Sequence, residues 1–161
     1  MIKRIVSAEQ FNKAADDISD YLNLKEEGNN YHYLLPNGVE SIKQAFAHDK
    51  MLAYNVFVWA NLNNLGKYDA GIIFLKDKGP RHGLEIFSEY IWLSSNPRAG
   101  YKLLATAIKY ARDNGFEHIQ MGCSEKSPNK DKVKSLYRRL GFIKDSENYI
   151  AKLWAEKLAK K

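Results

Sequence analysis

The sequence contains a single cysteine, Cys123, so it can form no internal disulfide. A chain without disulfides is typical of a reducing compartment, so we expect a cytoplasmic protein. No apolar run approaches the roughly 18 residues that a membrane-spanning helix needs, and residues 1–6 form no stretch of signal-peptide length. The four histidines show no metal-ligand spacing, and one cysteine cannot make a zinc pattern, so we expect no metal.

The chain of 161 residues has no internal repeat, linker or low-complexity segment. This length suffices for a buried core without metals or disulfides. We therefore expect one domain over residues 1–161.

Positive charge is concentrated toward the end of the sequence. The net charge is +6, but residues 98–161 carry +8 and the first 97 residues carry −2. A basic half attracts an anionic ligand, such as a nucleotide cofactor or nucleic acid. The alternative is a solvated, lysine-rich surface.

Hydrophobic periodicity and turn residues predict the elements. A capping box at Ser7–Gln10 starts a helix that reaches Leu22, a polar loop covers 25–38, and a shorter helix covers 39–48. Three strands with short turns follow, over 51–62, 69–76 and 84–93. Asn96-Pro97 opens a helix that ends near Asn114. A strand over 116–123, a helix ending at Leu140 and a last strand over 142–154 complete an α+β fold with a mixed sheet.

The turn before the third predicted helix resembles an anion-binding site. Helix N-termini present unpaired N–H groups, and Gly100 has no side chain to keep a phosphate from the backbone there. Arg98 and Lys102 add positive charge. The alternative is an ordinary turn between a strand and a helix.

Two segments resemble the GCN5-related N-acetyltransferase superfamily. Ser95-Asn-Pro-Arg-Ala-Gly100 resembles the family's Arg/Gln-x-x-Gly-x-Gly/Ala turn, although only Gly100 matches it. Leu136-Tyr-Arg-Arg-Leu-Gly-Phe142 resembles the second signature more fully, with Val133 in place of its alanine. The resemblance implies an α+β fold with a mixed, mostly antiparallel sheet of about six to seven strands, flanked by about four helices. It also implies an N-acetyltransferase that uses acetyl-CoA.

The resemblance assigns roles to individual residues. Tyr137 would protonate the leaving thiolate, and Glu89, in an apolar strand, would accept the proton of the amine. The alternatives are a core tyrosine and an exposed edge-strand glutamate. Cofactor binding falls to Leu93, Arg98, Ala99, Gly100, Tyr101, Lys102 and Asn129.

Three functions agree with this sequence. The first is acetyl transfer to the amine of a small molecule or peptide. The second is acyl transfer to nucleic acid, either a DNA base or charged tRNA, which the basic half would suit. The third is a binding or regulatory protein that has lost catalysis, as small, divergent, phage-type relatives would allow.

Overall fold

The computed structural model describes residues 1–31, 34, 37–78, 83, 85–123 and 129–144. The chain forms two compact units, Met1–Pro128 and Asn129–Lys161, which we take one at a time. That both belong to one domain stays a prediction. Within the described ranges, no helix is long and apolar enough to cross a membrane.

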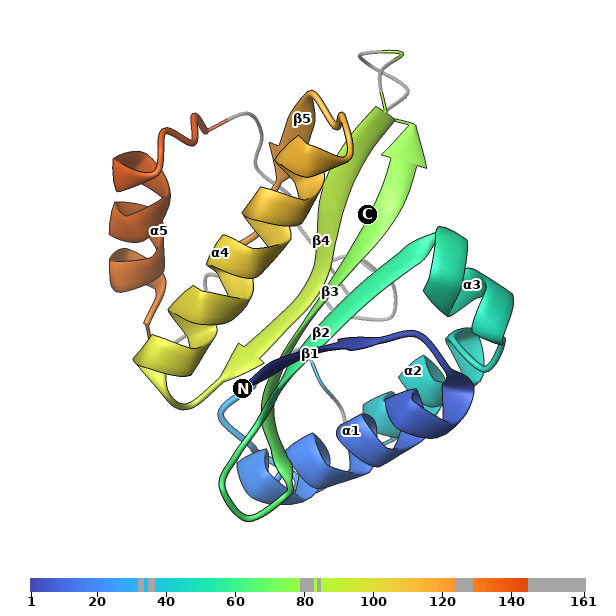
Figure 1. Cartoon of the computed structure of the whole chain (residues 1–161). Coiled ribbons are helices and arrows are strands. Elements are labelled where there is room, and N and C mark those ends of the chain that lie inside the picture. Colours follow the sequence, from blue (N-terminus) through green and yellow to red (C-terminus); the bar gives the residue numbers. More distant parts are fainter. Residues whose placement is uncertain (32–33, 35–36, 79–82, 84, 124–128, 145–161) are drawn as a thin grey trace, which may run out of the picture. The chain divides into compact units, whose positions relative to one another are not determined.

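The first unit is built on one sheet whose strands follow chain order (Figure 1). The strands are β1 (Ile2–Ile5), β2 (Val56–Leu62), β3 (Tyr68–Lys78), β4 (Glu85–Ser94) and β5 (His118–Gln120). The first four pair antiparallel, and β5 joins β4 in parallel. The prediction of a mixed, mostly antiparallel α+β fold is therefore confirmed.

The numbers of strands and helices differ from the expectation. The described part of the chain holds five strands and five helices, rather than six to seven strands and four helices. The strand expected over 142–154 falls mostly on residues 145–161, which lie outside the described ranges.

The helices of the first unit are α1 (Ala8–Leu22), α2 (Gly38–Ala45), α3 (Asp49–Tyr54) and α4 (Pro97–Asp113). The predicted capping box is confirmed, because Ser7 Oγ accepts from the Gln10 N–H and Gln10 Oε1 accepts from the Val6 N–H. The strand predicted from residue 51 is wrong at its start: residues 49–54 form α3, which buries Leu52 completely. Strand β2 begins only at Val56.

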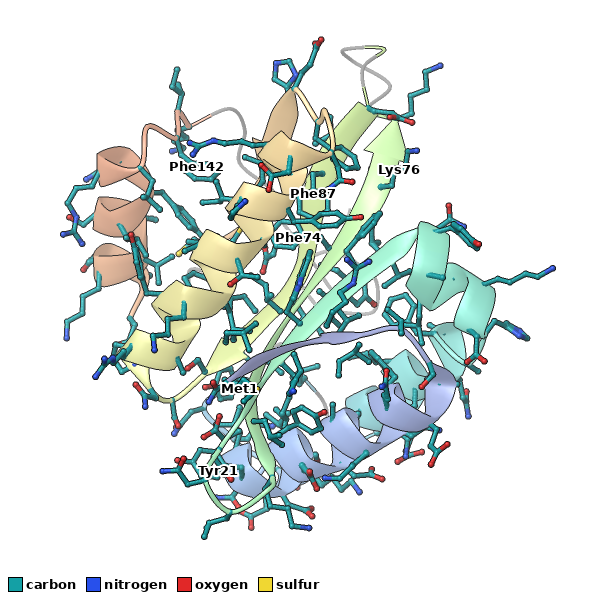
Figure 2. The ribbon with its side chains drawn as sticks, viewed as in Figure 1. Met1, Tyr21, Phe74, Lys76, Phe87 and Phe142 are labelled. Atoms are coloured by element: carbon teal, nitrogen blue, oxygen red, sulfur yellow. The ribbon has the colours of Figure 1, made fainter. Side chains whose placement is uncertain are left out.

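The two faces of the sheet have different cores. Helices α1 and α2 cover one face, where Ile18 of α1 shares a mainly aliphatic core with Val58 of β2 and Ile91 of β4. Helix α4 covers the other face, where the core is aromatic. Phe74 of β3 and Phe87 of β4 stack there with ring centroids 4.3 Å apart (Figure 2). The different faces of β4 thus point into different surroundings, which matters for the site.

Candidate active site

Strand β4 has a bulge halfway along its length. Opposite β3, Glu89 pairs with Phe74, but the next pair is Ile91 with Ile73, so Tyr90 has no residue opposite it. One extra residue in one strand is a β-bulge, which bends the strand and re-aims its side chains. The bulge also leaves the Tyr90 ring exposed, in an edge-on contact with Phe46.

The edge of β4 opens at the same point. The parallel strand β5 pairs only with residues 86–88 of β4. From Glu89 to Ser94, no neighbouring strand lies on that side within the described residues. An edge without a neighbouring strand is where a ligand can bond main-chain groups, so this part of β4 is a candidate binding edge.

Glu89 stands at the start of this open edge. Its Oε2 accepts a hydrogen bond from the backbone N–H of Gly122, just beyond β5, at 2.9 Å. Burial raises the pKa of the Glu89 carboxyl above its usual value, although the Gly122 N–H acts in the opposite direction. A carboxyl whose pKa moves toward neutrality is suited to accept a proton.

Glu85, four residues earlier, has different surroundings. No register shift separates the two glutamates, so they share a face of β4, as the spacing predicts. Glu85 is exposed and forms an ion pair with Lys76 at 3.0 Å. Glu89, in contrast, is partly buried.

Helix α4 begins where it is predicted to begin. Asn96 caps it: its Oδ1 accepts from the N–H groups of Arg98 at 3.0 Å and Ala99 at 3.4 Å, and its carbonyl accepts from the Gly100 N–H. The cap itself thus occupies three of the N–H groups that we expect to meet a phosphate. The charged side chains of Arg98 and Lys102, and the ring of Tyr101, are exposed on the first turns.

Gly100 is a glycine for a reason that the sequence did not indicate. Gly100 is buried, and a Cβ built on it would lie 3.2 Å from Ser94 Cβ and 3.7 Å from Trp92 Cζ2. The missing side chain therefore lets α4 lie close to β4, and the role of Gly100 at a phosphate stays a prediction. Two other proposed cofactor residues, Leu93 and Ala99, are also buried.

The second unit holds the remaining candidates. Tyr137 lies on α5 (Lys130–Arg139), and its ring is 5.3 Å from that of Phe142. The Phe142 N–H bonds the Tyr137 carbonyl across Gly141, whose φ of 89° favours glycine. Asn129 is the N-cap residue of α5, without a side-chain capping bond.

Comparisons with solved structures find the same architecture in acetyltransferases. A probable acetyltransferase has a TM-score of 0.66 at 14% identity, over 97% of this chain and 99% of its own. A ribosomal-protein-alanine N-acetyltransferase from Brucella melitensis biovar Abortus 2308 has 0.61 at 12%, over 94% and 99%. An aminoglycoside acetyltransferase from an uncultured soil metagenomic sample, in complex with sisomicin, has 0.63 at 13%, over 94% and 95%. The chain has the GCN5-related N-acetyltransferase fold. The sequence itself matches no protein-family profile and no curated protein.

The acetyltransferase fold brings some of the candidate residues together. Glu89 and Leu93 share β4, and the turn to α4 follows directly, so these residues lie along one open edge. Tyr137 and Asn129 belong to the second unit. Their roles remain those that the resemblance implies.

Two features of this acetyltransferase fold escaped sequence reasoning. Gly122 has no motif around it, and only its place just after a strand hints at a role. Tyr31 is half-buried, and burial raises the pKa of its hydroxyl, while the Ser94 backbone N–H acts in the opposite direction. Tyr31 therefore reaches the end of β4 from the segment between α1 and α2, and no local pattern announces this contact.

Proposed function

We propose that this protein transfers an acetyl group from acetyl-CoA to an amine, directly and in a ternary complex. The observation that carries the proposal is Glu89, a partly buried carboxylate with a raised pKa at the bulge and open edge of β4. The acetyltransferase fold of the chain supports the reaction class. A reducing, cytoplasmic location belongs to the same proposal.

Glu89 accepts a proton in this mechanism. Its carboxylate takes the proton of the acceptor ammonium, directly or through water, and its raised pKa favours that transfer near neutral pH. The amine nitrogen then attacks the thioester carbonyl carbon: a C–N bond forms, the C–S bond breaks, and the nitrogen releases its second proton to solvent to give the neutral amide. Tyr137 gives its phenolic proton to the departing thiolate, and solvent restores both side chains to their starting states.

The donor is held at the turn before α4. Arg98 and Lys102 would attract the phosphates by charge, and the positive end of α4 adds to this field. The N–H groups of Arg98 and Ala99 become available when the Asn96 side chain turns away from them. The exposed edge of β4, which includes Leu93, offers main-chain groups to the rest of the donor.

A small-molecule amine is the acceptor that we favour. One structural neighbour is an aminoglycoside acetyltransferase in complex with sisomicin, itself a small molecule. No described feature favours a nucleic-acid acceptor. The second candidate function is a non-catalytic binding protein, because Asn96 occupies helix N–H groups that a phosphate would need.

The decisive experiment measures free-thiol release from acetyl-CoA with a panel of amines, and compares Glu89→Gln with the wild type. Amine-dependent thiol release that falls in the variant supports the proposal. A thermal shift with acetyl-CoA adds a second readout, since a ligand at 100 times its Kd contributes about 2.7 kcal/mol. The absence of both a thermal shift and thiol release would support the binding protein, whose Asn96 cap keeps phosphates from these N–H groups. A thermal shift without thiol release would mean that acetyl-CoA binds and that none of the amines tested is its acceptor.

A further inference from the structure

An apolar cavity lies inside the first unit, on the face of the sheet that α1 and α2 cover. Its volume is about 60 Å³, and no charged side chain is among its described lining residues. Protein cores rarely contain voids larger than a water molecule, and apolar cavities stay dry and bind apolar molecules. This volume corresponds to about four to six water-sized probes, which is enough for a small aliphatic group.

Small residues from several elements create this space. Ala14 and Ala15 of α1 line it on one side, and Ala60 of β2 and Gly71 of β3 line it on the other. Ala14 and Ala60 are almost completely buried. The cavity therefore results from small residues on both the helix and the sheet that face each other, not from a single poorly packed side chain.

The cavity borders the open edge of β4. Ile91 and Leu93, just after the bulge, line it from the α1 face of the strand. Glu89 pairs with Phe74 and so points to the α4 face. Ile91 and Leu93 therefore place one wall of the cavity on the strand that carries Glu89, on the opposite face and two to four residues further along.

We infer that the acceptor is an amine carrying a small aliphatic group, which this cavity binds. The inference rests on the proposed acetyl transfer. The proposed donor site is at the start of α4, on the Glu89 face, so the donor approaches from that side. The opposite face is then left to the acceptor. A second positive charge on the acceptor would find no carboxylate among the described lining residues.

The test compares three acceptors with acetyl-CoA: isopentylamine, methylamine and 1,4-diaminobutane. We expect kcat/KM for isopentylamine to be at least about tenfold above the values for the other two amines. Burial of one methylene group alone strengthens binding by about three- to fourfold. Ala14→Val fills part of the cavity and should reduce the isopentylamine-to-methylamine ratio several-fold. Ala111→Val, on α4 and away from the cavity, is the matched control and should leave the ratio unchanged.

Other outcomes separate this inference from the proposed function. Transfer to all amines without preference would overturn the aliphatic-acceptor inference and leave the proposed function standing. A preference for 3-methylbutanoyl-CoA over acetyl-CoA that Ala14→Val removes would assign the cavity to the donor's acyl group instead. If no amine is acetylated, the proposed function fails. NMR titration of the wild type with isopentylamine and with methylamine then tests whether the cavity binds amines. Tighter binding of isopentylamine than methylamine, lost in Ala14→Val, would keep the cavity as an amine site, and equal binding would overturn it.

Discussion

The carboxylate of Glu89 and the backbone N–H of Gly122 lie 2.9 Å apart, and this contact joins the bulged strand β4 to the end of β5. A Cβ at position 122 would come within 3.3 Å of Glu89 Oε2. Gly122 is not one of the described glycines with a positive φ, so its backbone conformation does not require glycine. The absence of a side chain instead leaves space for the carboxylate, and we propose that Gly122 positions Glu89.

Glu89→Gln should lower turnover by about 10²–10⁴-fold, the usual contribution of a general base, while acetyl-CoA affinity stays near wild type. The amide oxygen can still accept from Gly122, so the contact survives without a titratable proton. The acidic limb of the kcat/KM profile should disappear. A limb that persists in the variant would mean that another group accepts the proton.

The same variant should also change how stability depends on pH. Burial raises the pKa of Glu89 in the folded state, so the folded chain binds this proton more tightly than the unfolded chain. This contribution to stability is complete below the unfolded pKa and is lost as pH rises through the folded pKa. Glu89→Gln should therefore remove that decline, which denaturant titrations across this pH range would detect.

Gly122→Ala tests the positioning role. The added Cβ pushes on Glu89 Oε2 and weakens the N–H contact that lowers the pKa of the carboxyl. The acidic limb of the pH–rate profile should therefore move to higher pH, with a loss of turnover at neutral pH. If Gly122 has only a structural role, Gly122→Ala should change the melting temperature and leave the acidic limb at its wild-type position.

The sequence predicted features that neighbouring residues determine. The Ser7–Gln10 capping box and the Asn96 cap each depend on side chains within a few residues of the bonds they make, and both are confirmed. The bulge at Tyr90 and the Gly122 contact depend on the pairing of distant strands. No local pattern encodes such pairing, so these parts of the site could not be predicted.

One interpretation failed because tertiary packing outweighed a local signal. The aromatic run that includes Tyr54 favoured a strand from residue 51, but a helical turn there buries Leu52. Gly100 has a packing reason for its missing side chain, the close contact of α4 with Ser94 and Trp92, and its part in a phosphate-binding turn stays a prediction.

Asn96→Ala should separate the helix cap from cofactor binding. Loss of the cap costs about 0.5–2 kcal/mol of stability, whereas Asn96→Gly costs only a few tenths. Both variants free the N–H groups of Arg98 and Ala99. If acetyl-CoA phosphates bind there, calorimetry at a temperature where both variants are folded should show equal or higher affinity. Lower affinity in both variants would mean that the Asn96 side chain is itself a ligand.

Gly100→Ala should affect packing more than cofactor affinity. Alanine favours a helix by about 0.5–1 kcal/mol over glycine, but overpacking typically costs about 1–3 kcal/mol. The new Cβ would lie 3.2 Å from Ser94 Cβ, so we expect a net loss on the order of 1 kcal/mol in thermal unfolding. Arg98→Ala is the contrasting variant, since it should weaken acetyl-CoA binding in a salt-dependent way with little change in stability. Gly100→Ala with normal stability and much weaker cofactor binding would instead support the ligand-facing interpretation.

Tyr137→Phe tests the proposed general acid. The variant loses one hydroxyl and keeps the ring, so the contact with the Phe142 ring at 5.3 Å should persist. The Gly141 turn should also form, because its bonds come from the backbone. Removal of the hydroxyl alone should therefore cost less stability than removal of the whole ring. Turnover should fall by about 10²–10⁴-fold, the usual contribution of a general acid, while acetyl-CoA affinity stays near wild type.

The choice of acyl donor sharpens this test. A donor whose thiol is more acidic than that of coenzyme A leaves without needing a proton, so Tyr137→Phe should lose much less activity with it. Leu140→Ala is the matched control: it removes a partly exposed apolar side chain from the end of the same helix, and its turnover per folded molecule should be equal with both donors. If Tyr137→Phe behaves like Leu140→Ala, with an equal loss for both donors that follows the amount of folded protein, Tyr137 is a packing residue. The thiolate would then take its proton from water or from another group.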